Sequence, residues 1–210
     1  MGGVTGIVLA GGRSSRLGRD KALLCFDGEP LILKVVRLLK GLCPEVLVIT
    51  GEERRYADLL DVPVVEDLVE GAGPLGGIYT GLTVSSHDYN LVVACDMPLL
   101  EPSLLSLISE RIAAASWAEA IVSQVRGRLE PFPGVYCRSC AGKIAELLAR
   151  GSRRVHEFLE LVQKEVIAEE EVRAVNPNLQ SFINLNNPEE LEELEWLGYK
   201  LQRANPMRAR

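Results

Sequence analysis

The sequence has little of what membrane-spanning, secreted or triad-based proteins need. No apolar run approaches the roughly 20 residues that cross a bilayer, and the opening residues MGGVTG lack the basic region of a signal peptide. The five cysteines are an odd number, which in a chain of 210 residues favours reduced thiols over a disulfide framework. The two histidines, His87 and His156, are isolated, and no serine or cysteine has a recognisable triad partner. We therefore expect a cytoplasmic protein without a nucleophilic triad.

A net positive charge is also missing. Lysine and arginine total 23 against 29 acidic residues, a net charge of −6 at pH 7, which argues against a nucleic-acid surface as the main partner. Any bound anion must then be held by local cations. The hydrophobic content of 47% is typical of a globular protein with a sizeable core. We expect one domain over residues 1–203 and a frayed tail over residues 204–210.

Short apolar runs alternate with segments of helical periodicity along the chain. Strands are predicted at residues 5–10, 44–50, 62–65, 90–95 and 120–125, and near Val166 and Ile183. Helices are predicted at residues 31–42, 52–60, 76–84, 102–115, 139–149, 155–163 and 187–202. This alternation predicts an α/β fold with a mostly parallel sheet that helices cover on both faces. Ligands of such sheets bind beyond the carboxyl ends of the strands.

Residues 5–24, TGIVLAGGRSSRLGRDKALL, run from an apolar strand into a loop of glycines and cations. Glycines at a strand end let backbone N–H groups turn toward a bound anion, and three arginines and Lys21 add full charges. The loop is not a Walker A motif, because Gly18 is followed by Arg19. Taken singly, these residues also suit a basic surface loop. The combination G-G-x-S-x-R-x-G-x-D-K favours a phosphate-binding loop.

Two aspartates also follow predicted strands. Asp96 comes directly after the apolar run NLVVAC, and Asp67 follows the strand at residues 62–65. A single carboxylate is a poor all-protein cage, but Mg²⁺ typically takes one or two carboxylates and completes its shell with waters and phosphate oxygens. Asp96 alone is therefore sufficient to hold Mg²⁺ beside a bound phosphate group. The alternatives are a capping role for Asp96 before Pro98 and a turn role for Asp67.

Two further motifs have weaker interpretations. Residues 71–76, GAGPLG, match G-x-G-x-x-G, which on its own suggests an NAD(P)-binding oxidoreductase. The motif does not follow its strand directly, and Pro74 removes one N–H from the loop, so a mobile loop that closes over a bound ligand suits it better. Cys137 and Cys140 form a bare CxxC, which without a second pair or histidines is not a zinc site.

The motifs together resemble a known family. LAGGRSSRLGRDKALL looks like the signature of the molybdenum cofactor guanylyltransferases, and VVACDMPLL resembles their metal-binding strand end. GPLGGIYTGL, LEPFPGVY, GSRRVHEFL and FINLNNPEEL follow in the expected order, so that the resemblance covers residues 6–194. The first two motifs are shared with cytidylyl- and sugar nucleotidyltransferases. The resemblance implies a three-layer, Rossmann-like nucleotidyltransferase fold.

It also implies an activity. A protein similar to this family is expected to transfer GMP from GTP to molybdopterin with Mg²⁺ as cofactor, releasing pyrophosphate. Nucleic acid and membranes are not expected partners, whereas proteins of cofactor biosynthesis or molybdoenzyme maturation are expected transient ones. A related cytidylyltransferase, another nucleotidyltransferase, the oxidoreductase and a non-catalytic nucleotide-binding module remain alternatives. The presence of both Lys21 and Asp96 argues against the last.

The resemblance finally implies site residues. The catalytic candidates are Lys21, Asp96 and Arg16. The nucleotide-binding candidates are Leu9, Ala10, Gly11, Gly12, Lys21, Asp67 and Asp96, and Asp96 is the candidate metal ligand. The acceptor-binding candidates are Arg128, Arg153, Arg154, Asn184 and Asn186. Judged from the residues alone, Arg153 and Arg154 are as typical of a solvated surface as of an acceptor-binding site.

Overall fold

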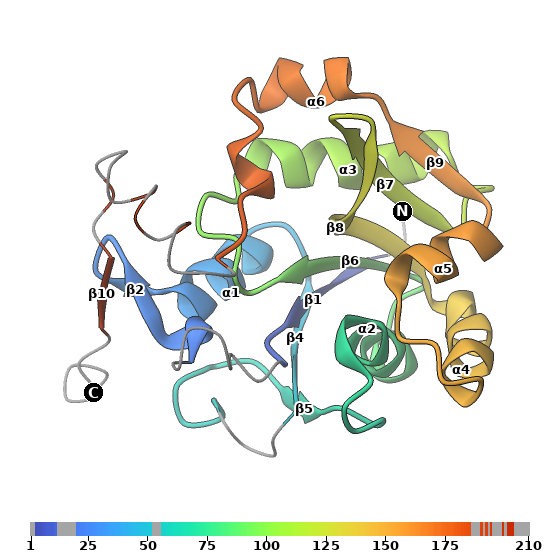
Figure 1. The fold of residues 1–210 in the computed structure, drawn as a ribbon, viewed down its shortest axis with the longest axis horizontal. Helices are drawn as coiled ribbons and strands as arrows, with labels where there is room; N and C mark the ends of the chain where they lie inside the picture. Colours follow the sequence, from blue (N-terminus) through green and yellow to red (C-terminus); the bar gives the residue numbers. More distant parts are fainter. Residues whose placement is uncertain are drawn as a thin grey trace.

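The computed structural model describes residues 3–11, 20–51, 56–185, 190, 192, 194, 199 and 201–203. Its centre is a seven-stranded sheet with the order β5-β4-β1-β6-β8-β7-β9 (Figure 1). The strands are β1 (Val4–Leu9), β4 (Glu45–Thr50), β5 (Val64–Glu66), β6 (Tyr89–Ala94), β7 (Ala120–Val125), β8 (Arg128–Cys137) and β9 (Lys164–Ile167). All run parallel except β8, which is antiparallel to both of its neighbours. The predicted mostly parallel sheet is confirmed.

Helices cover both faces of this sheet, as predicted (Figure 1). One face packs against α1 (Leu31–Lys40), α3 (Pro102–Ala114) and α6 (Glu169–Val175), and the other against α2 (Gly73–Val84), α4 (Ala141–Ala149) and α5 (Val155–Leu161). Successive side chains of β1 alternate between the two layers, with Val8 in the first and Ile7 and Leu9 in the second. Burial on both faces explains why this strand is a continuous apolar run. None of the described helices is long and apolar enough to cross a bilayer.

Helix α2 packs unusually close to β1 because glycines face the strand. A Cβ atom added at Gly77 would lie 2.9 Å from Leu9 Cδ2, and one added at Gly81 would lie 2.6 Å from Ile7 Cδ1. Real Cβ atoms do not approach that closely, so a larger residue at either position would force the buried side chain of Leu9 or Ile7 to shift. The helix begins with Gly73 and has Pro74 in its first turn. Its N-terminal end is thereby fixed over the carboxyl end of β1.

A small second sheet holds the chain that follows the basic loop. A 3₁₀ turn, η1 (Lys21–Leu23), leads directly into β2 (Leu24–Phe26), which pairs with β3 (Glu29–Pro30) and with β10 (Leu201–Arg203). The side chains of Leu24 and Phe26 belong to a separate apolar cluster that includes Leu99 and Leu185. These contacts fix the position of η1 relative to the large sheet.

Several local predictions differ from the structure. No strand was expected at residues 24–26, 29–30 or 128–137, which form β2, β3 and β8. The strand expected near Ile183 is absent, because residues 180–182 form the 3₁₀ turn η3 (Gln180–Phe182) and residues 183–185 have no regular structure. Residues 56–59 are a turn rather than the end of a helix, and Leu201–Arg203 is a strand rather than the end of a helix. The predicted tail, residues 204–210, lies outside the described residues, so the domain boundary stays a prediction.

Candidate active site

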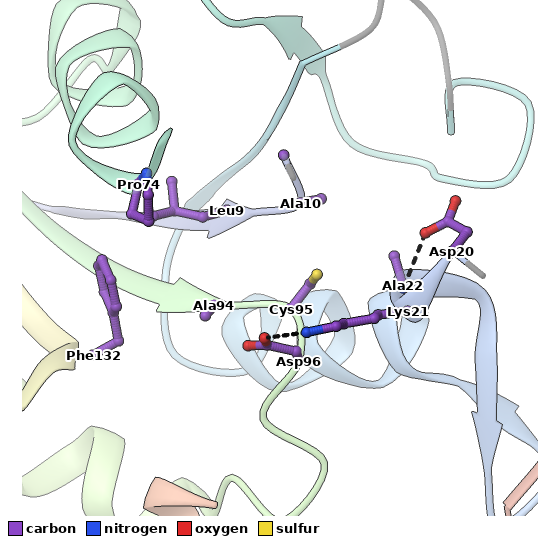
Figure 2. Close-up of a pocket in the computed structure, with 11 residues that line it drawn as sticks. Leu9, Ala10, Asp20, Lys21, Ala22, Pro74, Ala94, Cys95, Asp96 and Phe132 are labelled. Atoms are coloured by element: carbon purple, nitrogen blue, oxygen red, sulfur yellow. Dashed lines mark hydrogen bonds and ion pairs between the residues drawn. The ribbon is translucent and has the colours of Figure 1, made fainter. Parts of the chain in front are cut away.

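A cavity lies where the two central strands of the sheet end. Its walls come from the ends of β1 and β6, from η1, from α2 and from β8 (Figure 2). The lining residues are Leu9, Ala10, Gly11, Asp20, Lys21, Ala22, Pro74, Ala94, Cys95, Asp96 and Phe132. The glycine motif after β1 and the aspartate motif after β6 thus meet at the carboxyl edge, where parallel sheets bind their ligands.

Backbone hydrogen bonds hold the chain where it leaves β1. Leu9 and Ala94 are register partners, Cys95 N donates to Leu9 O at 3.1 Å, and Ala10 N donates to Ile49 O at 2.8 Å. Gly11 then passes so close to the chain after β4 that an added Cβ would lie 3.3 Å from a backbone nitrogen. At Gly11 the wall of the cavity is therefore backbone, which suits close approach of a ligand.

Lys21 and Asp96 face each other across the cavity (Figure 2). Lys21 Nζ lies 3.6 Å from Asp96 Oδ2, and the two side chains are only 16% and 21% exposed. Burial raises the pKa of Asp96 above its ordinary value, and the ammonium group of Lys21 opposes that rise. A buried carboxylate that has a cation beside it can remain charged at neutral pH and still present oxygens to the cavity.

Asp20 fixes the direction in which Lys21 leaves the backbone. Its Oδ1 accepts a hydrogen bond from Ala22 N at 3.1 Å, which caps η1. The hydroxyl of Tyr56, a buried side chain, also donates to both carboxylate oxygens of Asp20 at 3.0 Å. Because Asp20 is bound from two sides, the lysine that follows it has little freedom.

The turn after Asp96 is held by two groups that the sequence did not single out. Lys34 of α1 donates to Pro98 O at 2.5 Å, and its Nζ lies 4.3 Å from the centroid of the Phe26 ring. Burial lowers the pKa of Lys34. From the other side, Leu185 N donates to Asp96 O at 2.9 Å. A lysine in an amphipathic helix is an ordinary pattern, so nothing in the sequence could have marked Lys34.

Asp67 lies at the same edge of the sheet, after β5, but is not among the described residues that line the cavity. Its N–H donates to Thr50 O at 2.8 Å, and its Oδ1 accepts from Thr80 Oγ1 at 2.6 Å. The same threonine oxygen accepts from Leu68 N at 3.0 Å. Burial raises the pKa of Asp67. Its carboxylate is thus engaged with α2, and an added Cβ at Gly76 would lie 3.4 Å from it.

The two adjacent arginines differ in their surroundings. Arg153 donates to the carbonyl oxygen of Gly71, in the loop that precedes α2. Arg154 pairs with Glu157 at 2.7 Å, and its side chain is 80% exposed. Arg153 therefore contacts the chain that leads to Pro74 and the cavity, whereas Arg154 faces solvent.

The remaining predicted residues are placed as follows. Asn184 precedes Leu185 and so lies next to Asp96, and its Oδ1 is buried and accepts no hydrogen bond among the described residues. Arg128 begins β8 and lines a second cavity. Gly12, Arg16 and Asn186 lie outside the described residues.

The described residues contain no group of three or more histidine, cysteine, aspartate or glutamate side chains that could enclose a metal ion. Asp96 offers a single hard oxygen ligand at a cavity, which suits Mg²⁺ held jointly with a phosphate.

Burial raises the pKa of Cys137 to about 11 and that of Cys140 to about 12. Both thiols donate to backbone carbonyls and are protonated at neutral pH, so they are poor metal ligands and nucleophiles.

Comparison with known proteins shows extensive similarity. Residues 6–170 match the MobA-like NTP transferase domain. The chain is 36% identical to the probable molybdenum cofactor guanylyltransferase of Pelotomaculum thermopropionicum, covering 89% of each chain. It is 33% identical to the molybdenum cofactor guanylyltransferase of Desulfosudis oleivorans, covering 93% of this chain and 96% of the relative. The crystal structure of molybdopterin-guanine dinucleotide biosynthesis protein A from Archaeoglobus fulgidus has the same fold, with a TM-score of 0.82 at 24% identity over 93% of this chain and 98% of that one.

Proposed function

The chain belongs to the MobA-like NTP transferase domain family, and from this premise we propose that it transfers GMP from GTP to molybdopterin and releases pyrophosphate. Two relatives named for that activity are similar to it over nearly its whole length. The observation that carries the proposal is the Lys21–Asp96 pair, which faces the backbone of residues 9–11 across one cavity. A charge pair beside exposed backbone is what a triphosphate requires.

In this proposal the nucleotide lies against the backbone of residues 9–11. The absence of a side chain at Gly11 lets a phosphate approach the backbone N–H of this residue. Lys21 lies 3.6 Å from the carboxylate of Asp96, so its ammonium group reaches the space that the phosphates of GTP would occupy. The protein as a whole has a net charge of −6, and this local cation offsets the repulsion between two anionic substrates.

Asp96 is the residue that would hold Mg²⁺. Its carboxylate is largely buried, its backbone is fixed by Leu185, and the turn that follows is fixed by Lys34. Bound there, the ion supplies charge stabilisation to the phosphate oxygens. Lys21 opposes the rise in the pKa of Asp96 that burial causes and so favours the ionised carboxylate, which is the state that can bind a cation.

The transfer itself needs position and charge more than proton transfer. An oxygen of the acceptor phosphate forms a bond to the α-phosphorus of GTP, and the bond from that phosphorus to the bridging oxygen breaks, so that pyrophosphate leaves with the electron pair. A phosphate monoester is largely ionised at pH 7, since its second pKa is about 6. No general base is then required, and the described cavity contains no histidine. Lys21 stabilises the negative charge that accumulates as the bonds change.

The oxidoreductase alternative is disfavoured by the geometry of its motif. Strand β5 ends at Glu66, and α2 begins only at Gly73, so the glycines do not join a strand to a helix directly. The carbonyl of Gly71 accepts a hydrogen bond from Arg153.

As part of the same proposal, we place the protein in the cytoplasm, where GTP is available and where its five free thiols would remain reduced.

The test is pyrophosphate release in the presence of GTP, molybdopterin and Mg²⁺, with Asp96→Asn compared to wild type. We expect the variant to fold and to lose turnover by roughly 10²–10³-fold, the usual effect of removing one preorganised charge partner. The exposed carboxylate of Asp58 provides the control, and Asp58→Asn should match wild type. An Asp96→Asn protein that stays active and Mg²⁺-responsive contradicts the assignment. Turnover of CTP in place of GTP would identify a cytidylyltransferase instead.

A further inference from the structure

A second cavity, of about 410 Å³, opens beside the candidate active site. It is formed by the β7–β8 hairpin and by the segment around η3. Its lining residues are Val125, Arg126, Arg128, Glu130, Leu179, Phe182 and Ile183. Strand β7 runs parallel to β6, so its end at Val125 lies at the same carboxyl edge of the sheet as Asp96. The volume lies within the range of about 300–1,000 Å³ that is typical of small-molecule sites.

Two short stretches of chain connect this cavity to Asp96. Phe132 lines the first cavity, and Glu130, two residues before it on β8, lines the second. Ile183 lines the second cavity, and Leu185, two residues after it, donates to the backbone of Asp96. Figure 2 shows Phe132 on the side of Asp96 that faces away from Lys21. A ligand in the second cavity would therefore approach Asp96 from the side opposite Lys21.

The second cavity combines an apolar wall with charged side chains. Leu179 is buried, and Phe182 and Ile183 are partly buried, so one wall is apolar. Arg126 and Arg128 are exposed at the hairpin. Glu130 is half-buried, and no described residue donates a hydrogen bond to its carboxylate. Burial raises the pKa of Glu130, and the charges of His156, Arg128 and Arg126 oppose that rise and favour the ionised form. Two carboxylate oxygens thus remain available to a ligand in a partly apolar site.

A carboxylate in such a cavity favours a ring with two adjacent N–H donors. An ionised glutamate only accepts hydrogen bonds, and its two oxygens match a pair of adjacent N–H donors. The 2-amino-4-oxopyrimidine edge of a pterin offers such a pair, from its amino group and its ring N–H. Phe182 adds an aromatic surface, and Arg126 and Arg128 supply positive charge for an anionic substituent.

We propose that Glu130 binds the pterin ring of the acceptor in this second cavity, with Phe182 against the ring. This inference rests on the proposed function and adds the acceptor subsite to it. The guanine base has the same hydrogen-bonding edge, but the nucleotide occupies the first cavity in that proposal. The acceptor phosphate then enters between the two cavities, opposite the nucleotide and next to Asp96, as an in-line transfer requires.

The test uses two commercial pteridines and their intrinsic fluorescence. Lumazine has an oxo group in place of the 2-amino group of pterin, so it lacks one donor of the pair. We expect the wild-type protein to bind pterin about 10- to 100-fold more tightly than lumazine. In Glu130→Gln this preference should fall to within about threefold, while the melting shift caused by Mg²⁺-GTP stays that of wild type. Glu110→Gln, at an exposed carboxylate of α3, should keep the full preference.

A second variant separates ring recognition from folding. Phe182→Leu should weaken pterin and lumazine equally, because it removes aromatic contact and leaves Glu130 in place. If Glu130→Gln binds pterin like wild type while GTP binding is normal, the subsite is overturned. Equal weakening of GTP and pterin would overturn it as well, since the cavity would then hold the base. If the wild-type protein binds no GTP, but prefers pterin to lumazine and the Glu130→Gln variant does not, the pterin subsite is supported and the proposed guanylyl transfer is contradicted.

Discussion

Lys21 and Lys40 each pair with an aspartate, and comparing them separates a site residue from a surface residue. The Lys40–Asp61 pair is short, at 2.5 Å, but its side chains are 45% and 75% exposed. Pairs of that kind contribute little, because water screens them. The longer Lys21–Asp96 pair is mostly shielded from water, so its charges act on each other and on a ligand more strongly.

We therefore predict that Lys21→Met lowers the single-turnover rate by about 10²–10³-fold at saturating GTP. The substitution keeps the apolar stem and removes the charge, which leaves Asp96 without the ammonium group that opposes the rise of its pKa. Lys40→Met is the matched control and should change the free energy of unfolding by less than about 1 kcal/mol, with the rate unchanged. Equal rates in the two variants would mean that Lys21 is a surface residue.

At the scale of single residues, the sequence predicted which motifs lie together but not how they are held. Topology brings Gly11 and Asp96 to one edge, and the structure shows both in one cavity. Lys21 was predicted as part of the basic loop, but it begins the 3₁₀ turn η1 and is largely buried. Lys34 was missed because its role depends on Pro98, 64 residues away in sequence. Local patterns cannot report such long-range contacts.

The packing of α2 on β1 is an element-scale feature that can be tested by adding one methyl group. Gly81→Ala places a Cβ 2.6 Å from Ile7 Cδ1 and 2.9 Å from its Cγ2, inside a fully buried contact. We predict that it lowers the free energy of unfolding by about 1–3 kcal/mol, despite the higher helix propensity of alanine.

Gly142→Ala in α4 is the control for helix propensity. Nothing lies within 4 Å of its added Cβ, so the substitution should stabilise the protein by up to about 1 kcal/mol. Urea denaturation measures both variants. If the two alanines stabilise equally, the close approach of α2 to β1 is not a constraint.

Glu119 joins three elements at the opposite edge of the sheet. It precedes β7, accepts from Lys143 of α4 at 2.7 and 2.8 Å, and accepts from Gln163 N, before β9, at 3.1 Å. The hydrogen bond from Lys143 lowers the pKa of Glu119, while burial opposes this. A carboxyl group with a lowered pKa in the folded state stabilises the protein above its unfolded pKa of about 4.3, and this contribution is lost as the pH falls through the folded pKa.

We predict that Glu119→Gln lowers the free energy of unfolding by roughly 1 kcal/mol at pH 7. The difference from wild type should shrink as the pH is lowered from 5 to 3, because the wild-type carboxylate is then protonated. Glu146→Gln, on the same helix as Lys143, is the control, since both side chains of the Glu146–Arg150 pair are 75% exposed. A difference between Glu119→Gln and wild type that does not depend on pH would show that the charge is not responsible.

At the element scale, β8 is the main feature that the sequence did not predict. Its segment RLEPFPGVYC contains Pro131, Pro133 and Gly134, which usually argue against a strand. The structure accommodates them at an irregular stretch, where the pairing of β7 with β8 shifts between Ile121 and Ser123. The parallel strands were predicted because burial on both faces makes them continuous apolar runs, whereas β8 has no such signal.

At the scale of the whole molecule, ligand binding should raise the free energy of unfolding. We predict that Mg²⁺-GTP at 100 times its dissociation constant raises the free energy of unfolding by about 2.7 kcal/mol. In a protein of this size that corresponds to roughly 5–10 °C in melting temperature. ATP, CTP and UTP should give smaller shifts at the same concentration, and NAD(P) none. A shift with NAD(P) and none with any triphosphate would restore the oxidoreductase hypothesis.

The reversed direction of β8 has a consequence for how such proteins diversify. The turn between β7 and β8, at Arg126 and Gly127, has positive φ angles of 51° and 75° and lies at the edge where the parallel strands end. Residues added to this turn in pairs lengthen the hairpin without changing the strand register beneath it. In the proposed arrangement, changes in the length of this hairpin would alter which acceptors fit, while β1, β6 and the groups that carry out the transfer stay as they are.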